Sequence, residues 1–547
     1  MKVRGTLRNR ENQVGRALKR QRTNKQEKLL REGSNEEVLL ADVHALISGL
    51  EPEENPQSSE VDIEKTGLTE KLDRVSLPSP LTEIEVKIIS ISSTGDGLAI
   101  QSPFKHIYVV PFTLPGDIVR VKVIKHFPEE HYSLADFLNV VEPSPLRDDS
   151  LIRCRYFAKC SGCQFQMLDY QTQLSHKRSV VEKAYKNFSQ LPTELVPEVS
   201  DTTGSPLQYG YRTKLTPHFD GPPGYRSRSA RKSGIKKAFE TKPDIGFMQK
   251  GQRKTLDIED CPIGTDAVRM GMKNERIRVA VELGKYQRGA TILLRESTER
   301  IHNTDAKMEL PNRPDTITVS CGSHTDLKTY ITDNNATSTE YIDSFIFTNP
   351  AGSFFQNNNS ILPVFTQYIR ENVLPPTNTT NQASQIKFLI DAYCGSGLFT
   401  ITLSSLFSSS TGIDISSASI EYALKNAALN NIPLTQVSFI AADALDLFKS
   451  ITYPANETAV IIDPPRKGCD ELFLNQLLKF APKRVVYVSC NVHTQARDVG
   501  ILTRGKASVV YEIESLRGFD FFPQTSHVES VAVLSRVDKV ETGVERG

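Results

Sequence analysis

The fold of this chain is decided by residues 387–397, which read KFLIDAYCGSG. The apolar run Phe388–Ile390 ends at Asp391, and two glycines, Gly395 and Gly397, follow it closely. Glycine lets the backbone turn sharply and approach a ligand at close range. The stretch therefore predicts a buried strand that ends in a ligand-binding turn, with a helix opening after it.

Four further apolar runs follow at the spacing of alternating strands and helices. They end near Asp414, Ala441, Ile462 and Val488, and a helix is predicted over 417–430. Such alternation gives right-handed crossovers and a parallel sheet, with ligands at the carboxyl ends of the strands. We therefore expect an α/β domain of the Rossmann type over residues 346–540.

Acidic residues at these strand ends favour a cofactor with a ribose. Asp414 can accept hydrogen bonds from two ribose hydroxyls, as in nicotinamide and S-adenosylmethionine sites alike. Thr400 stands where a pyrophosphate fingerprint would place its third glycine, which favours S-adenosylmethionine because that cofactor has no phosphates. Asp443, after the third strand, is placed to bind the adenine amino group, with a helix N-cap as an equally good alternative.

A cysteine, Cys490, ends the fifth predicted strand between the polar residues Ser489 and Asn491. Most single cysteines are inert and buried, but the ligand-binding edge of the sheet favours a nucleophile here. A thiolate that adds to carbon 6 of uracil lets carbon 5 attack a methyl sulfonium, and a base must then remove the carbon 5 proton. Glu529 offers that base, and burial would raise its pKa. The segment 463–466 (Asp-Pro-Pro-Arg) is stiff enough to hold a flat base.

Together these motifs resemble the RNA uracil-5-methyltransferases over about residues 81–537. The resemblance implies that Cys490 is the nucleophile and that Glu529 abstracts the proton. Leu398 departs from the family, because bacterial members have a cofactor-binding Asn there, and the family usually has Glu at position 414. The resemblance also implies cofactor contacts for four side chains: Gln356, Tyr393, Asp414 and Asp463.

Residues 81–145 predict a small β-barrel, because short alternating runs at 84–88 and 119–123 are separated by Gly/Pro turns. The polar face carries Lys87, Arg120 and Lys122. Nucleic-acid binding and a merely solvated sheet face explain these cations equally well. The segment 83–142 resembles the OB-like TRAM domain, which implies RNA binding.

Residues 151–345 predict a mixed α+β central domain that opens with a cysteine cluster. Four thiolates suit an iron–sulfur cluster or zinc equally well by chemistry alone, and plain thiols are the alternative. The resemblance adds that some family members hold a [4Fe-4S] cluster with such a pattern. A basic loop over 223–237 is a candidate contact for RNA phosphates. The four cysteines are Cys154, Cys160, Cys163 and Cys261.

Residues 1–80 predict a disordered, charged tail with one helix near 38–46. Residues 1–31 hold 11 Lys and Arg against two acids, which suits a nuclear or a mitochondrial address. No apolar run reaches the roughly 18 residues of a membrane span. We expect a monomer without membrane contact in the cytoplasm or nucleus, with the mitochondrion as a third compartment.

The expected reaction is methylation of carbon 5 of a uridine in RNA. The polar tail and the Ser/Thr/Asn-rich insertions look eukaryotic, where the usual family substrate is the T-loop uridine at position 54 of tRNA. The cysteine cluster instead favours the 23S ribosomal RNA branch. Cytosine-5 methylation would require a second catalytic cysteine, and an RNA-binding or RNA-folding module with incidental methylation is the alternative outside enzymology.

Overall fold

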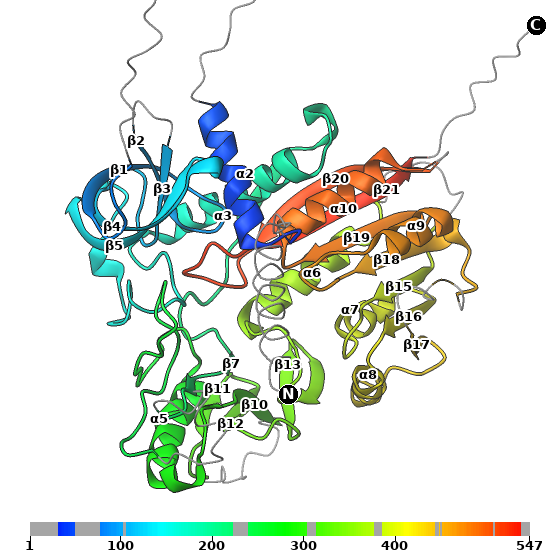
Figure 1. Cartoon of the computed structure of the whole chain (residues 1–547). Helices are drawn as coiled ribbons and strands as arrows, with labels where there is room; N and C mark the ends of the chain where they lie inside the picture. Colours follow the sequence, from blue (N-terminus) through cyan, green and yellow to red (C-terminus); the bar gives the residue numbers. More distant parts are fainter. Residues whose placement is uncertain are drawn as a thin grey trace, which may run out of the picture.

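The computed structural model describes residues 31–49, 77–101, 106–222, 239–302, 313–376, 385–442, 448, 451–506 and 509–537. These residues form a β-barrel, a central α+β region and a large α/β region, which Figure 1 shows as three parts of the molecule. Within the described residues, no helix has the length and apolar character needed to cross a membrane.

The α/β region is built on an eight-stranded sheet in the order β17-β16-β15-β18-β19-β21-β20-β6. The first five strands in this order, from β17 to β19, run parallel to one another. Strand β21 lies between β19 and β20 and runs antiparallel to both. The predicted Rossmann-type domain is confirmed. The strands are β6 (Val199–Thr203), β15 (Phe388–Ala392), β16 (Ser409–Asp414), β17 (Val437–Ala441), β18 (Thr458–Ile462), β19 (Arg484–Ser489), β20 (Val510–Phe519) and β21 (Glu529–Val537).

Helices cover both faces of this sheet and bury an apolar core on each. Ile390 of β15 faces one core, and its neighbour Leu389 faces the other. Burial on both faces explains why central strands such as β15 and β18 contain continuous apolar runs rather than an alternating pattern. The helices on the first face are α3 (Tyr170–Phe188), α9 (Glu471–Phe480) and α10 (Val492–Arg504). Those on the second are α6 (Leu362–Asn372), α7 (Leu398–Thr402) and α8 (Ser417–Leu429).

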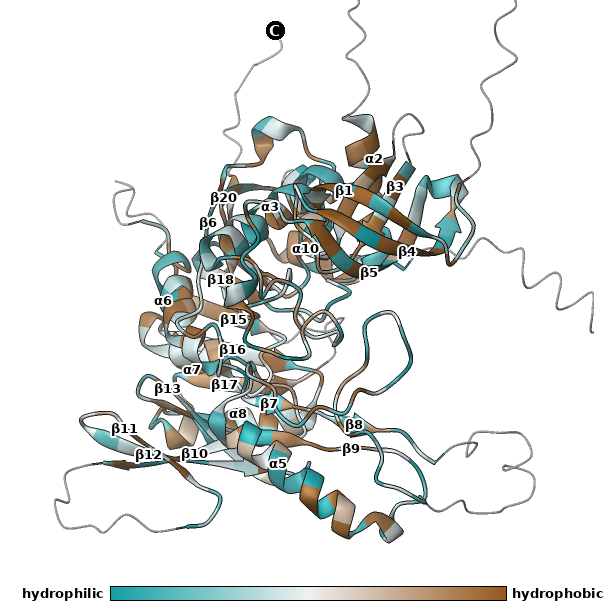
Figure 2. Cartoon of the chain, turned by 90° about the vertical axis from the view of Figure 1, so that its left-hand side faces the viewer, coloured by the Kyte–Doolittle hydropathy of each residue, from teal (hydrophilic) through white to brown (hydrophobic). Residues whose placement is uncertain are grey.

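The barrel is closed, with strand order β1-β2-β3-β5-β4. In Figure 2 its strands alternate between brown and teal, as a sheet with one buried face requires. The predicted basic face is mixed in charge, because Arg120 pairs with Glu85 and Lys122 lies opposite Glu83 and Asp136. The strands are β1 (Glu83–Ile91), β2 (Gly97–Gln101), β3 (His106–Val110), β4 (Ile118–Phe127) and β5 (Tyr132–Glu142).

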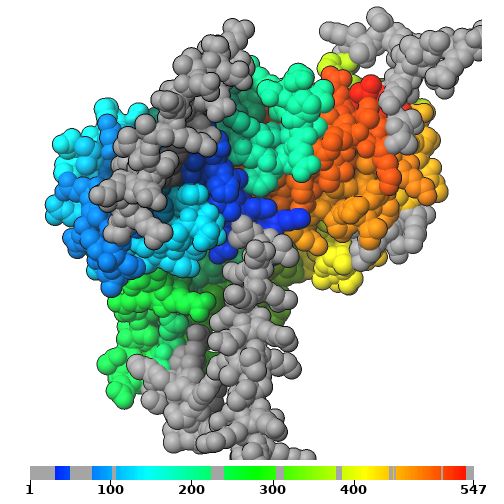
Figure 3. All heavy atoms as spheres, turned by 45° about the horizontal axis from the view of Figure 1, so that its top comes forward, coloured from blue at the N-terminus to red at the C-terminus, as the bar shows by residue number. Residues whose placement is uncertain are grey.

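Part of the segment predicted as a tail is folded. Helix α2 (Asn35–Ser48) is longer than the predicted helix, because Ser34 caps its first turn by accepting a hydrogen bond from the Glu37 N–H. Its residues Leu39 and Val43 are buried against the barrel. Figure 3 shows this segment, in dark blue, lying between the barrel and the α/β region. Contacts so distant in sequence leave no local pattern, so sequence reasoning missed them.

The central region combines a four-stranded sheet, in the order β11-β12-β10-β7, with helix α5 (Asp266–Val281). This arrangement confirms the predicted α+β class of the central region. The predicted basic loop over 223–237 lies outside the described residues. The strands are β7 (Lys214–Leu215), β10 (Leu294–His302), β11 (Ile317–Ser320) and β12 (His324–Ile331), beside the pairs β8 (His218–Phe219) with β9 (Ala290–Thr291) and β13 (Thr337–Ile342) with β14 (Phe345–Pro350).

Candidate active site and cysteine cluster

The glycine turn after β15 is held by a buried carboxylate. Asp391 accepts hydrogen bonds from the backbone N–H of Thr400, at 2.8 Å, and from its hydroxyl, at 2.7 Å. Tyr393 and Gly397 have φ values of 64° and 91°, the left-handed region that a tight turn uses. Burial raises the pKa of Asp391 to about 7. Sequence reasoning quoted Asp391 only as a strand end and missed this supporting role.

Asp414 lies beside that turn, at the carboxyl end of the neighbouring strand β16. One of its oxygens accepts a hydrogen bond from the Gly395 N–H at 3.1 Å, and the other accepts one from the Ser416 N–H at 2.8 Å. Each carboxylate oxygen has a second lone pair. The geometry therefore leaves Asp414 able to accept hydrogen bonds from a ribose next to the turn.

Of the other predicted cofactor residues, Tyr393 lies in the turn itself and Gln356 lies in the segment after β14. The ring of Tyr393 packs against Phe473, with 5.5 Å between ring centroids, and burial raises the pKa of its phenol. Gln356 follows β14 and is 7% exposed. Asn426 of α8 donates hydrogen bonds to the carbonyls of Thr348 in β14 and Ser396 in the turn, so it ties the two segments together. The predicted adenine-binding Asp443 lies outside the described residues.

The nucleophile candidate and the base candidate meet across two paired strands. Ser489 of β19 lies opposite Ser530 of β21. Continued by one residue, that register would bring Cys490 opposite Glu529, and the two groups are close enough for the Glu529 charge to raise the pKa of the Cys490 thiol. Residues directly opposite each other point to the same face of a sheet, with Cβ atoms about 5 Å apart. A thiol and a carboxyl thus lie side by side at the edge of the sheet where the glycine turn after β15 also lies.

Glu529 has a carboxyl oxygen that no group of the described residues satisfies. It is 1% exposed, and its Oε1 atom has no hydrogen-bond partner among the described residues. Burial raises its pKa well above the ordinary value, nearby Asp463 raises it further, and the Arg466 guanidinium opposes both effects. Asp463 itself, at the end of β18, has its pKa raised to about 7 by burial and by Asp391. A carboxyl with a raised pKa is a strong base once ionised.

Arg466 is the cation of this cluster, and sequence reasoning assigned it no role of its own. Burial raises the pKa of the Cys490 thiol to about 12, Glu529 and Asp463 add to the rise, and Arg466 opposes it by charge and by a hydrogen bond. The side chain of Asn491 donates to the Arg466 carbonyl at 2.9 Å, which ties the nucleophile turn to the segment 463–466. Arg466 therefore favours the thiolate that nucleophilic attack requires.

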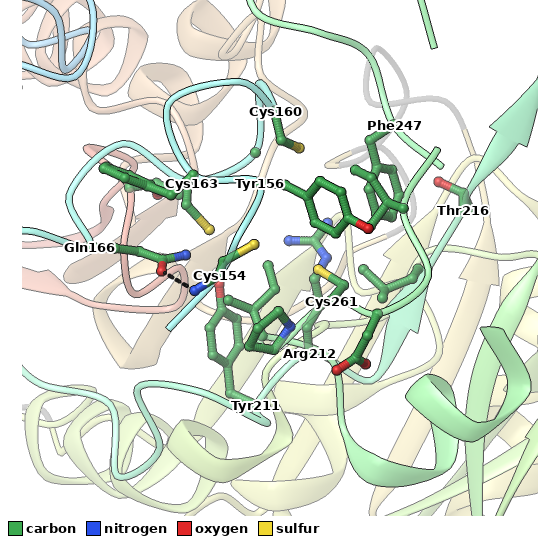
Figure 4. A pocket seen from close by; sticks show the side chains of 18 residues that line it. Cys154, Tyr156, Cys160, Cys163, Gln166, Tyr211, Arg212, Thr216, Phe247 and Cys261 are labelled. Atoms are coloured by element: carbon green, nitrogen blue, oxygen red, sulfur yellow. Dashed lines mark hydrogen bonds between the residues drawn. The ribbon is translucent and has the colours of Figure 1, made fainter. Parts of the chain in front are cut away.

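The four predicted cysteine ligands line one cavity of about 310 Å³, beneath the barrel and against the central region. Figure 4 shows their sulfur atoms around the cavity, with the Arg212 guanidinium nearby. Among the described residues, three candidate ligand atoms gather within 4.8 Å only at Cys321, His324 and Asp326, so the four thiols are spread more widely. Four thiols that face one cavity suit either zinc or an iron–sulfur cluster.

Polar groups in the cavity wall also suit a charged cluster. Gln166 fixes its carbonyl oxygen by accepting hydrogen bonds from the Arg153 and Cys154 N–H groups, which leaves its buried amide to face the Cys163 thiol. That amide is a donor for a thiolate or sulfide. Burial raises the pKa of Cys163 to about 12, so a thiolate there requires a bound cation. The residues present therefore fit a thiolate-bound cluster.

The sheet order and the acidic glycine turn define a fold of the methyltransferase class, in which a cysteine lies against a buried carboxyl at the ligand-binding edge. The family model described as tRNA (uracil-5-)-methyltransferase matches residues 328–537. The tRNA (uracil(54)-C(5))-methyltransferase of Schizosaccharomyces pombe is 44% identical to this chain, covering 96% of it and 87% of the relative. The Saccharomyces cerevisiae enzyme of the same name is 43% identical, covering 83% of this chain and 73% of its own. The chain belongs to the tRNA (uracil-5-)-methyltransferase family.

A solved structure shares the fold over most of the chain. The Pyrococcus abyssi tRNA (uracil-54, C5)-methyltransferase, crystallised with S-adenosyl-L-homocysteine, superposes with a TM-score of 0.56 at 23% identity. The match covers 82% of this chain and 100% of the archaeal one. It confirms the predicted fold class, a Rossmann-like methyltransferase domain accompanied by smaller domains.

Proposed function

We propose that this protein transfers a methyl group from S-adenosylmethionine to carbon 5 of uridine 54 in the T loop of tRNA. The observation that carries the proposal is the opposition of Cys490 and Glu529 beside the cofactor turn. The relatives from two yeasts, whose names specify this nucleoside, support the choice of tRNA over ribosomal RNA.

The reaction begins at the thiol. The Cys490 thiolate, favoured by Arg466, adds to carbon 6 of the uracil and forms a carbon–sulfur bond. The electron pair of the 5,6 double bond moves into the ring as an enolate. Carbon 5 then attacks the sulfonium methyl, and S-adenosylhomocysteine leaves with the electron pair of the broken carbon–sulfur bond.

The reaction ends at the carboxylate. Glu529, in its ionised form, takes the proton from carbon 5, and the electrons of that bond restore the double bond and expel the Cys490 thiolate. Glu529 makes no hydrogen bond through Oε1 to the described residues, so that oxygen is available to the substrate. Burial and Asp463 raise the pKa of Glu529, which increases the driving force for proton removal.

The cofactor would lie along the carboxyl edge of β15, β16 and β18. Asp414 would accept the ribose hydroxyl hydrogen bonds, and the glycine turn would leave room for the methionine part. Gln356, Tyr393 and Asp463 would line the remainder of the site. Asp443 would contact the adenine amino group.

The substrate is tested by methylating tRNA transcripts with purified protein. A transcript with uridine 54 should gain one 5-methyluridine, whereas a transcript with cytidine 54 should gain none, because the proposed reaction takes uracil at that position. Nucleoside mass spectrometry measures both products. Methylation of 23S-type ribosomal RNA fragments, with unmodified tRNA, would instead support the ribosomal branch.

Cys154, Cys160, Cys163 and Cys261 would hold a [4Fe-4S] cluster, with Gln166 and Arg212 donating toward its negative charge. The cluster would join two segments separated by about 100 residues and so stabilise the fold by restricting the unfolded chain. The thiols are not set against the nucleophile, so no step of methyl transfer passes through them.

Cys163→Ser should lower the stability of the fold more than it lowers the rate of methyl transfer. We expect loss of iron and a lower melting temperature, by several degrees, with methyl transfer per folded molecule within about threefold of wild type. Iron and sulfide analysis of anaerobically purified protein, with thermal unfolding, measures this. Wild-type protein without iron or sulfide would reduce the four cysteines to plain thiols or a zinc site.

The parts of the chain would divide the work. The TRAM-like barrel (81–145) and the basic loop (223–237) would contact RNA, the central domain (151–345) would carry the cluster, and residues 346–540 would perform the chemistry. We propose that the protein acts as a monomer in the cytoplasm or nucleus.

A further inference from the structure

A fully buried ammonium group lies under the segment that leads to Glu529. Lys177 of α3 is 0% exposed, as is its partner Asp520 at the end of β20. The two are joined at 2.5 Å. Asp520 and Glu529 bound the segment 520–529, which connects β20 to β21. Burying an ion pair costs desolvation free energy, and the pair by itself adds little to the stability of the fold. The position of this pair under the segment therefore indicates a role other than stability.

Lys177 also donates to two backbone carbonyls of that segment. Its Nζ lies 3.0 Å from the Phe522 carbonyl oxygen and 2.7 Å from the His527 carbonyl oxygen. An ammonium has three donors, and all three are therefore used on residues 520–527. His527 is two residues before Glu529. One side chain thus fixes both the start and the end of the connection that delivers the base.

Further contacts clamp the middle of the same segment. Gln173, one turn before Lys177, accepts a hydrogen bond from the Gln524 N–H at 3.0 Å. The Gln524 carbonyl accepts from the N–H of Gln164, at 2.7 Å. The side-chain oxygen of Gln164 accepts from the Ser526 N–H at 3.1 Å. These bonds hold the middle of the segment 520–529, whereas Lys177 holds residues near its two ends.

The far side of the segment reaches the cluster around the nucleophile. The His527 ring lies 3.4 Å from a guanidinium nitrogen of Arg466, the cation that faces Cys490. Glu529 itself has no hydrogen bond through Oε1 to the described residues that would hold its side chain in place. The position of the carboxylate therefore depends on its backbone. That backbone is held on one side by the pairing of Glu529 with Phe519 of β20, and on the other by the segment that the buried contacts from α3 fix.

We infer that Lys177 is a positioning residue for the proton-abstraction step: its buried ammonium holds the segment 520–529 so that Glu529 reaches carbon 5 of the adduct. The inference rests on the proposed function, because it takes Glu529 as the base. Adduct formation and methyl transfer need Cys490, which follows β19 and lies outside the segment 520–529. Loss of Lys177 should therefore slow proton abstraction, the last step, more than the earlier ones. A base displaced by about 1 Å can cost about 10²-fold in rate.

The test compares two variants of the full chain. The first variant combines Lys177→Met with Asp520→Asn, so neither charge of this pair is left buried. The new amide oxygen of residue 520 can still accept a hydrogen bond from the Tyr170 hydroxyl, but the Phe522 and His527 carbonyls lose their donor. In Asp520→Asn alone, Lys177 keeps its bonds to the Phe522 and His527 carbonyls. The single variant leaves a buried cation unpaired, so it is expected to be the less stable of the two.

Single-turnover reactions with tRNA separate the steps. In the double variant we expect adduct formation within about threefold of wild type, release slowed by about 10²-fold, and protein–RNA conjugate accumulating on denaturing gels. Asp520→Asn alone should release product nearly as wild type despite its lower melting temperature. A merely structural role would instead slow both variants in order of their stability, and that result overturns the inference.

The same gels keep the two proposals apart. If Glu529→Gln accumulates conjugate and the double variant does not, Lys177 is not a positioning residue but the proposed function stands. If Glu529→Gln accumulates none, the assignment of the base fails, and the inference fails with it.

Discussion

Cys490→Ala is expected to abolish methylation of tRNA, with a loss of at least about 10⁴-fold in turnover. Without the thiolate, carbon 5 of the uracil remains a poor nucleophile, and no other thiol among the described residues is set opposite Glu529. The loss should lie in the chemical step, because Cys490 belongs to the turn after β19 and not to the cofactor turn after β15. Methyl transfer to a T-loop transcript measures it.

Two controls make the result specific. Binding of S-adenosylmethionine by calorimetry should remain within about threefold of wild type in Cys490→Ala. Cys321→Ala removes an exposed thiol of the central region and should leave turnover unchanged. A transcript with 5-fluorouridine at position 54 should form a conjugate with wild type and with Cys321→Ala only. Wild-type turnover by Cys490→Ala would exclude the thiolate mechanism.

The sheet could be predicted because its strands bury both faces. A run such as 485–488 is continuously apolar, and its end marks the ligand-binding edge. Asp414, Asp463 and Cys490 could therefore be placed on that edge from sequence alone. The two glycines of the cofactor turn added the local signal, since their left-handed backbone is rare in other residues.

The contacts between distant segments could not be predicted. Nothing in the spacing of Cys490 and Glu529 reveals that β21 lies between β19 and β20, which is what brings the two residues together. Helix α2 was expected within a tail because its burial depends on the barrel rather than on its own sequence. Likewise, Lys177 looks like a surface residue of a helix until its partners on the segment 520–527 are known.

Glu529→Gln is expected to stall the enzyme after methyl transfer. Glutamine has nearly the size of glutamate but cannot accept the carbon 5 proton, so the methylated RNA should remain bound to Cys490 and turnover should fall by about 10²- to 10⁴-fold. Denaturing gels should show a conjugate that carries the labelled methyl group. Glu512→Gln, which alters an exposed carboxylate of β20, should release product at the wild-type rate.

The pH dependence of release identifies the base further. Burial and Asp463 raise the pKa of Glu529, so its ionised form is lost as the pH falls through that raised value, and release by wild type should slow as the pH decreases. Glutamine does not titrate, so the residual release by Glu529→Gln should lack this limb. If the variant instead releases product quickly, or if its slow release keeps the wild-type pH limb, another group takes the carbon 5 proton. Asp463 would then be the first candidate, because its own pKa is raised to about 7 and it lies beside both Cys490 and Glu529.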